Sequence, residues 1–253
     1  NGSAKKVFAV FKTKDMKWLV VASAIGGPVG MTGYVLAVNY MGSSIGAIAS
    51  AVYPAIGSVM AFLFLKEKIK WYQWLFLIFT LCGVFGISYS PDLNIENFWL
   101  GLFGAFMCAF GWGAEGVILS KCLKNEIVKS EYALQIRQTV SSLVYALVII
   151  TAVDGWDFTY ILICEDGSRV IPVIMLAALF ATVSYLLYYK TINKKGVAKA
   201  MGLNITYTAW AVIFSVLYSG DNSIISPVMV FCGIVVVLCG ILSATDIKSL
   251  FKK

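Results

Sequence analysis

The stretch VIPVIMLAALFATVSYLLYYK, residues 170–190, holds no charged side chain before its last residue, Lys190. About 20 consecutive apolar residues are what an α-helix needs to cross the hydrocarbon core of a bilayer. A helix buried in a soluble domain seldom carries an apolar run of this length. The stretch therefore predicts a transmembrane helix.

The rest of the chain has the same character. Of its 253 residues, 60% are hydrophobic and 13% are charged, and the mean hydropathy is +0.84. A soluble domain is about half apolar and about a quarter charged, so lipid has to be the outer solvent. The sequence predicts an all-α polytopic membrane protein, whose eight apolar runs cover 18–41, 43–65, 71–89, 98–120, 132–153, 170–190, 197–219 and 225–245.

The charged residues alternate between linkers, which predicts the orientation. One set of linkers is rich in lysine: Lys5, Lys6, Lys12, Lys14 and Lys17; Lys66, Lys68 and Lys70; Lys121, Lys124 and Lys129; Lys190, Lys194, Lys195 and Lys199; Lys248, Lys252 and Lys253. The other linkers hold Asp92, Glu96, Asp154, Asp157, Glu165, Asp166 and Asp221, and Arg169 is their only basic residue. Because basic loops stay in the cytoplasm, both termini are expected there.

Several classes of protein are disfavoured by what the chain lacks. It has no histidine, and its six cysteines form no CxxC pair, so we expect no metal and no cofactor. No carboxylates are paired at helical spacing within a span, which argues against an enzyme. No GxxxxGK[ST] motif is present to couple ATP. The net charge of +7 is spread over the linkers, so nucleic acid is not expected as a partner.

The sequence also matches itself weakly. Residues 34–67 resemble residues 185–221, most clearly where Ser50-Ala51-Val52-Tyr53 aligns with Asn204-Ile205-Thr206-Tyr207. Leu81-Cys82-Gly83-Val84 likewise resembles Leu238-Cys239-Gly240-Ile241. Spans one to three thus resemble spans six to eight, which cross the membrane in the opposite direction. Inverted repeats of this kind are the building plan of many secondary transporters.

Ionisable residues at membrane depth are costly and are candidates for function. Glu115 lies in span four and Arg137 near the cytoplasmic end of span five. Two interpretations remain open for them. They pair with each other across two neighbouring helices, or Glu115 offers a negative charge or a proton to a substrate pathway.

Polar and aromatic residues share helix faces near the middle of several spans. Trp112 lies three residues from Glu115, and Asn204, Tyr207 and Trp210 follow one another at the same spacing. Polar groups in lipid face the interior of a bundle, so we expect these faces, with Tyr185, Tyr188, Tyr189, Gln135 and Gln138, to meet around a pocket. Aromatic walls with one carboxylate suit an organic cation. Glycines and Pro28 in Gly26-Gly27-Pro28-Val29-Gly30 are expected to bend span one.

The chain resembles the EamA-type branch of the drug/metabolite transporter (DMT) superfamily, and within it the LicB-type bacterial choline permeases. The resemblance rests on segments spread over most of the sequence. They are Gly27-Pro28-Val29-Gly30-Met31, Gly42-Ser43-Ser44, Ala51-Val52-Tyr53-Pro54-Ala55-Ile56, Phe62-Leu63-Phe64-Leu65-Lys66, Trp112-Gly113-Ala114-Glu115, Ile136-Arg137-Gln138, Ser184-Tyr185-Leu186 with Tyr188-Tyr189, and Lys199-Ala200 with Gly202-Leu203-Asn204, Tyr207 and Trp210.

The resemblance implies ten helices in two inverted repeats, of which this chain supplies helices three to ten. Residues 1–17 are then a cytoplasmic segment, 18–89 a partial first repeat of three helices, 98–246 a second repeat of five, and 247–253 a cytoplasmic tail. Two further helices are expected before residue 1. The resemblance also implies an aromatic cage for choline, formed by Trp112, Tyr185, Tyr188, Tyr207 and Trp210 with the polar partners Glu115, Gln138 and Asn204.

The leading hypothesis is a secondary transporter, a symporter or uniporter, that moves choline or a related quaternary amine across a bacterial inner (plasma) membrane. Three alternatives stay open: a DMT importer or exporter of an amino acid, a drug-like cation or another metabolite; a membrane-embedded enzyme, disfavoured above; and a non-transporting partner subunit. The expected partners are the small cation and the lipid bilayer, with a homodimer left open.

Overall fold

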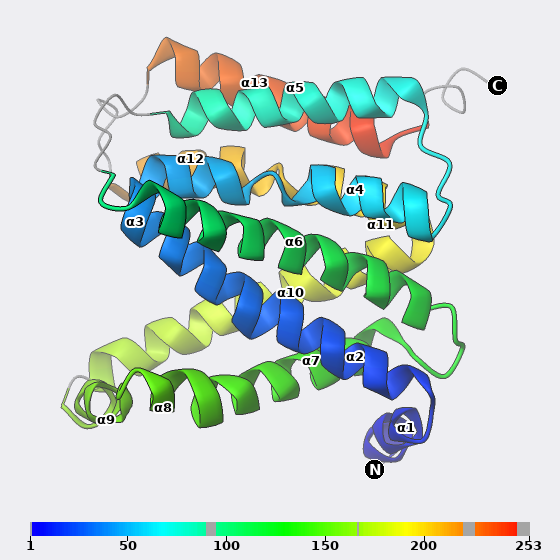
Figure 1. Cartoon of the computed structure of the whole chain (residues 1–253), viewed down its shortest axis with the longest axis vertical. Helices are drawn as coiled ribbons and strands as arrows, with labels where there is room; N and C mark the ends of the chain where they lie inside the picture. Colours follow the sequence, from blue (N-terminus) through cyan, green and yellow to red (C-terminus); the bar gives the residue numbers. More distant parts are fainter. Residues whose placement is uncertain (1, 90–94, 166, 220–225, 247–253) are drawn as a thin grey trace.

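The computed structural model describes residues 2–89, 95–165, 167–219 and 226–246, and every regular element in these ranges is a helix (Figure 1). Two segments, η1 and η2, are single π-helical turns inside longer helices. The bounds are α1 Gly2–Phe11, α2 Asp15–Ala24, η1 Ile25–Val29, α3 Gly30–Ser50, α4 Tyr53–Phe64, α5 Trp71–Ser88, α6 Phe98–Cys122, α7 Ser130–Val144, η2 Tyr145–Ile149, α8 Ile150–Ala152, α9 Trp156–Cys164, α10 Gly167–Lys195, α11 Val197–Asn204, α12 Tyr207–Ser219 and α13 Pro227–Ala244. The all-α class is confirmed.

Seven helical runs in the described residues are long and apolar enough to cross a membrane. They correspond to seven of the eight expected spans, and the second one, residues 43–65, is not among them. The second span is not a single helix, and neither is the seventh, 197–219, which is divided into α11 and α12. The first part of the second span continues α3 to Ser50, and its second part is α4, which has only 12 residues. Where a bend was expected in span one, the helix contains the π-helical turn η1, which includes Pro28. Asp92, Asp166, Asp221, Lys248, Lys252 and Lys253 lie outside the described residues.

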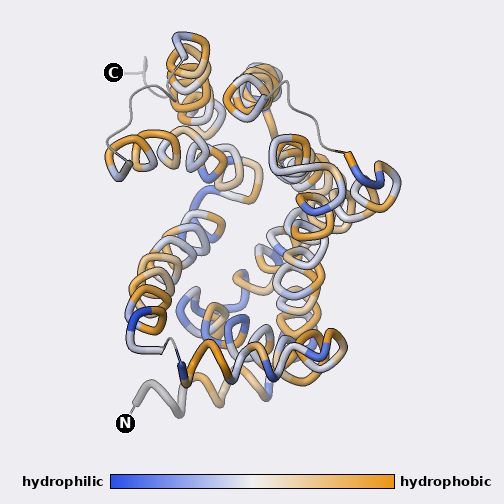
Figure 2. Tube along the Cα trace, turned by 90° about the vertical axis from the view of Figure 1, so that its left-hand side faces the viewer, coloured by the Kyte–Doolittle hydropathy of each residue, from blue (hydrophilic) through white to orange (hydrophobic). Residues whose placement is uncertain are grey.

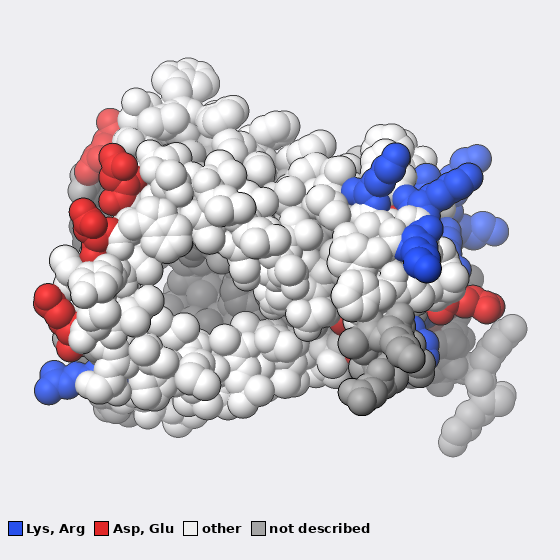
Figure 3. All heavy atoms as spheres, turned by 90° about the horizontal axis from the view of Figure 1, so that it is seen from below, with Lys and Arg blue, Asp and Glu red and all other residues white. Residues whose placement is uncertain are grey.

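Charged side chains gather at the two ends of the helices (Figure 3). In that view most acidic groups, with one basic group, lie at one end, and most basic groups lie at the other. We call them the acidic end, at the linkers with Glu96, Asp154, Asp157, Glu165 and Arg169, and the lysine-rich end, at the linkers with Lys66, Lys68, Lys121, Lys124, Lys190 and Lys195. On the face that Figure 3 shows, the surface between the two ends is uncharged, as a lipid-facing surface requires.

Apolar side chains also cover the outside of the bundle. Figure 2 shows hydrophobic residues along the helices and hydrophilic ones mainly at the turns. On α10 the side chains of Val173 and Phe180 are each 67% exposed. A water-soluble protein does not expose this much contiguous apolar surface. The chain is therefore a multi-pass membrane protein.

Small residues allow the central helices to approach closely. α3 lies along α6 (Figure 1), and a Cβ built on Gly33 would lie 2.7 Å from the backbone nitrogen of Cys108. A Cβ built on Gly104 would lie 2.9 Å from the backbone nitrogen of Ala37. Close packing of this kind holds helices together where lipid removes the hydrophobic driving force. α5 and α13 form a second pair at one edge of the bundle.

Two glycines with positive φ interrupt the helices at positions that correspond in the internal sequence match. Gly42 (φ 80°) ends the first long helix at the acidic end, and Gly196 (φ 91°) ends α10 at the lysine-rich end. After each glycine comes a short half-helix, 43–50 or α11, then a two-residue turn, and then a second half-helix, α4 or α12. The turns, at Ala51 and Ile205, are aligned in the internal sequence match, and both residues belong to one buried cluster.

Candidate substrate-binding site

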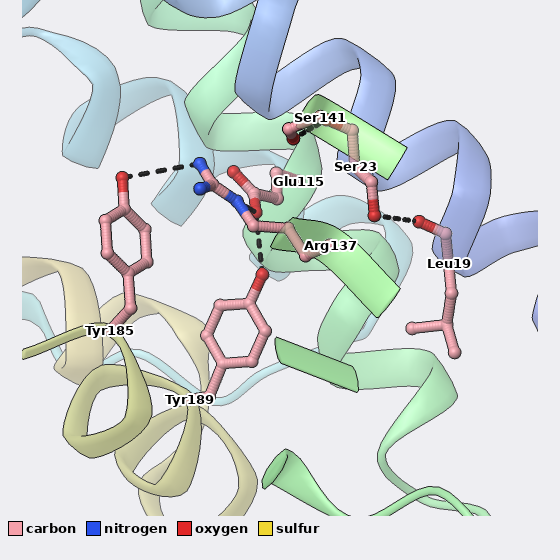
Figure 4. A network of polar contacts seen from close by, with 7 residues as sticks. All are labelled: Leu19, Ser23, Glu115, Arg137, Ser141, Tyr185 and Tyr189. Atoms are coloured by element: carbon pink, nitrogen blue, oxygen red, sulfur yellow. Dashed lines mark hydrogen bonds and ion pairs between the residues drawn. The ribbon is translucent and has the colours of Figure 1, made fainter. Parts of the chain in front are cut away.

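The ionisable residues at membrane depth form one buried network. The Oε1 atom of Glu115 on α6 accepts a hydrogen bond from Arg137 Nε on α7 at 3.0 Å and another from the Tyr189 hydroxyl on α10 at 2.7 Å. The guanidinium carbon of Arg137 also lies 4.4 Å from the centre of the Tyr185 ring. Figure 4 shows the guanidinium held between the Tyr185 hydroxyl and the Glu115 carboxylate. Of the two interpretations left open for Glu115, the structure contains the ion pair.

The π-helical turn η1 packs against this network. A Cβ built on Gly26 would overlap the carboxylate of Glu115, and one built on Gly27 would overlap the hydroxyl of Ser141. The Ser141 hydroxyl donates to the carbonyl of Ser23 at 3.3 Å, across the α7–α2 contact (Figure 4). The side chains of Arg137 and Glu115 are only 11% and 8% exposed. The glycines therefore leave room for a buried pair that links α6 to α7 beside η1.

An aromatic cluster lies beside the turn between the first two half-helices. Trp112 on α6 meets the ring of Tyr53 edge-on, with centroids 5.4 Å apart, and stacks on Tyr34 of α3 at 6.1 Å. Asn204, the last residue of α11, donates from Nδ2 to the Tyr53 hydroxyl at 2.7 Å. Aromatic pairs prefer such edge-on and offset arrangements. Three aromatic rings and one amide thus converge from four helices.

A cavity of about 240 Å³ adjoins this cluster on the α10 side. Asn204 belongs to both, because it also lines the cavity together with Tyr188, Tyr207 and Trp210. The remaining lining is half polar, with Ser184, Thr191 and Thr206, and half apolar, with Leu187, Ala200 and Leu203. The volume is below the range of roughly 300–1,000 Å³ that is typical of drug-sized ligands. A cavity of this volume suits a small molecule.

The structure distributes seven of the eight predicted site residues over three places. Tyr188, Asn204, Tyr207 and Trp210 line the cavity, Trp112 belongs to the aromatic cluster, and Glu115 and Tyr185 contact Arg137. Gln138 is joined to none of these groups by a side-chain hydrogen bond, and only its carbonyl accepts one, from Ser142. The Gln135 amide donates to Thr139 on an exposed surface, so it lies outside the expected pocket.

The predicted set omitted Tyr34 and Tyr53, which belong to the cluster around Trp112. The sequence contains a signal for Tyr53, since the internal match aligns it with Tyr207, which is one of the predicted site residues. Among the described residues, no three His, Cys, Asp or Glu side chains gather closely enough to hold a metal ion.

The fold and the site define a class: a multi-pass α-helical membrane protein with broken half-helices and an aromatic site between them. Comparison with known proteins agrees with this class. Residues 4–89 match the model of the EamA-like transporter family. Protein LicB of Haemophilus influenzae (strain ATCC 51907 / DSM 11121 / KW20 / Rd) is 28% identical over 194 residues, which are 76% of this chain and 63% of LicB. The resemblance stated from the sequence is confirmed: the chain is EamA-like and LicB-like.

The chain spans 63% of the length of that curated relative. A solved crystal structure of another protein has the same fold, with a TM-score of 0.57 at 11% sequence identity. The likeness covers 94% of this chain and 93% of that protein's chain. At this identity it supports the helical arrangement alone.

Proposed function

We propose that the protein is a DMT-type secondary transporter that moves a small organic cation, choline first among the candidates, across a bacterial inner membrane by alternating access. The lysine-rich end then faces the cytoplasm, as the positive-inside bias requires. The EamA-like match and the likeness to LicB support transport. The cation is argued from the site.

The observation that carries the choice of substrate is the aromatic cluster at the broken helices. The rings of Tyr34 and Tyr53 pack against Trp112. Asn204 bonds to Tyr53 and also lines the cavity with Tyr188, Tyr207 and Trp210. A quaternary ammonium has no N–H group to donate, so aromatic rings are its natural partners. Each cation–π contact contributes ~0.5–2 kcal/mol, depending on desolvation.

The distribution of positive charge supports the same substrate class. Among the described residues, Arg137 is the only basic residue well inside a span, and its guanidinium is paired with Glu115. An anionic substrate would need an unpaired lysine or arginine at that depth, where such charges are expensive. A neutral aromatic site instead receives a cation without an opposing charge.

The test is uptake of radiolabelled choline into proteoliposomes with an inside-negative membrane potential, which favours entry by ~2.3 kcal/mol per charge per 100 mV. Trp112→Ala should lower the apparent affinity about 5- to 30-fold, which corresponds to a loss of ~1–2 kcal/mol of cation–π contact. The matched control is Trp99→Ala, because Trp99 is 77% exposed at the acidic end of α6 and should leave uptake unchanged.

Two results would contradict the proposal. One is choline uptake that is no faster than in empty liposomes. The other is an equal loss of uptake in the Trp112 and Trp99 variants. A thermal-shift series with choline, neutral amino acids and anionic metabolites then separates the remaining substrates, since a ligand that binds the folded state raises the melting temperature with its concentration.

A further inference from the structure

A second cavity, of about 160 Å³, lies at the lysine-rich end. It is bordered by the linker 65–70 and by α4, α5, α10, α11 and α13, which approach one another there (Figure 1). It shares no lining residue with the cavity beside Asn204. This second cavity therefore has no part in the proposed cation site.

The charged lining of the second cavity is mainly basic. Three lysines contribute to it, one from the linker 65–70, one at the end of α10 and one in the first turn of α11: Lys68, Lys195 and Lys199. None of the three forms an ion pair with a described residue. Because like charges around one cavity repel one another, an anion bound between them would be favoured.

The carboxylates near this cavity already have donors. Glu67, the only acidic residue of the lining, accepts the backbone N–H of Val197 through Oε1 at 2.9 Å and that of Ala198 through Oε2 at 3.3 Å. Asp246, a second carboxylate at this end, is paired with Lys70. The three lysines of the lining thus outnumber its one carboxylate, and the cavity carries a net positive charge.

A buried hydroxyl without a partner also lines the cavity. Ser58 of α4 is only 1% exposed, and its Oγ makes no hydrogen bond to any described residue. The other buried polar side chains of the lining are bonded, since the Gln73 amide donates to the Ser243 carbonyl at 3.1 Å and the Ser243 hydroxyl donates to Gly240 at 2.8 Å. A buried O–H group without an acceptor is costly. An acceptor oxygen inside the cavity would remove that cost.

We propose that this cavity binds a phosphate group, carried by a membrane lipid or by a small phosphate in the solution at the lysine-rich end. The Ser58 hydroxyl donates to a phosphate oxygen, and the three lysines neutralise the charge, since lysine binds phosphate as a point charge. Basic pockets between transmembrane helices bind anionic lipid head groups. The volume is well below that of drug-sized sites, so a single phosphate group fits better than a nucleotide.

The experiment is thermal unfolding of the whole chain in detergent micelles, followed by tryptophan fluorescence. Inorganic phosphate is titrated against chloride at equal ionic strength. The Tm should rise with phosphate and then follow the binding curve of one site, which gives an apparent Kd. Ser58→Ala should raise that Kd about 2- to 10-fold, the loss of one hydrogen bond. Because the hydroxyl has no partner in the protein, the same variant should not lower the Tm without phosphate.

The lysines are tested one at a time. Lys68→Gln and Lys199→Gln each remove one positive charge, and each should raise the apparent Kd about 10-fold. Lys68 is exposed on the linker 65–70, so its variant should fold normally. Lys121→Gln is the matched control, because Lys121 is an exposed lysine of the same end that does not line this cavity. It should leave the Kd unchanged.

A second titration identifies the source of the phosphate. Dihexanoyl phosphatidylglycerol is compared with dihexanoylglycerol, which has the same acyl chains and no phosphate. A rise in Tm with the phospholipid, but not with inorganic phosphate or dihexanoylglycerol, assigns the site to a lipid head group. A rise with inorganic phosphate alone assigns it to a free phosphate. Either result supports the phosphate site.

Three results would overturn the proposal. The first is a Tm that rises no more with either phosphate probe than with chloride or dihexanoylglycerol. The second is an equal effect of Lys121→Gln and Lys199→Gln on the Kd, which would indicate only general screening of charge. The third is an unchanged Kd in Ser58→Ala, which would leave the hydroxyl to a water molecule. None of these results depends on the transported substrate, so the proposal stands or falls separately from choline uptake.

Discussion

Removing one partner of the Glu115–Arg137 pair should destabilise the protein far more than removing both. The pair is buried, with side chains 8% and 11% exposed, and Glu115 Oε1 accepts from both Arg137 Nε and the Tyr189 hydroxyl. Arg137→Met leaves an uncompensated carboxylate, and Glu115→Gln leaves an uncompensated guanidinium. Each single change should cost about 3–5 kcal/mol. The double variant leaves no buried charge and should recover most of that loss.

The assay is thermal unfolding in detergent micelles, followed by the fluorescence of the seven tryptophans. For a chain of this size, 1 kcal/mol corresponds to a shift in Tm of roughly 2–4 °C, so each single variant should unfold about 6–20 °C below the wild type. The double variant should lie much closer to the wild type. Single variants within about 2 °C of the wild type, or a double variant as unstable as the sum of the singles, would refute the reasoning.

Two further predictions concern packing and pH. Gly26→Ala should lower Tm through a loss of ~1–3 kcal/mol, because its Cβ would overlap the Glu115 carboxylate, whereas Gly233→Ala, whose Cβ would meet its nearest atom at 4.0 Å, should leave Tm unchanged. At the lysine-rich end, the hydrogen bond from Lys70 lowers the pKa of the Asp246 carboxyl below its usual range, and the same bond raises the pKa of Lys70. The pair therefore stabilises the fold above the unfolded pKa of Asp246, about 3.9, and this stabilisation is lost as the pH falls through the lower folded value. Wild type should exceed Asp246→Asn in Tm at about pH 7 and lose that advantage at about pH 2; an advantage that persists in acid would contradict the assignment.

Span positions were predictable because they depend on one-dimensional signals. An uninterrupted apolar run such as 170–190 can only be satisfied in lipid, and helix α10 contains it. The alternation of lysine and acidic linkers likewise corresponds to the two charged ends (Figure 3). The division into a three-helix and a five-helix repeat, and the helices expected before residue 1, stay predictions.

The helix interruptions at Gly42 and Gly196 were harder to predict, because the presence of a glycine does not show which backbone conformation it adopts. Gly42 and Gly196 adopt positive φ, while Gly46, four residues after the first of them, continues its helix. Composition alone does not distinguish these cases, since glycine is permissive in both. The internal sequence match could have done so, because it places Gly42 and Gly196 at corresponding positions before the aligned segments Ser50–Tyr53 and Asn204–Tyr207.

The sequence predicted which residues lie in the site better than it predicted which partners they contact. Helical spacing placed Trp112 and Glu115 on one face, and both point into the bundle. Spacing could not decide that Trp112 contacts tyrosines of the first repeat while Glu115 pairs with Arg137, because that depends on where α3, α4 and α7 pack. Gln138 shows the same limit: it lies one residue from Arg137, yet its side chain makes no hydrogen bond to the network.

The central claim, an aromatic site that carries an organic cation across the membrane, is tested most directly by choline uptake at an imposed membrane potential. Wild-type protein in proteoliposomes should accumulate radiolabelled choline when the interior is negative. Trp112→Ala should need about 5- to 30-fold more choline for the same rate. Uptake equal to that of empty liposomes, or an unchanged choline dependence in the Trp112→Ala variant, would contradict the account.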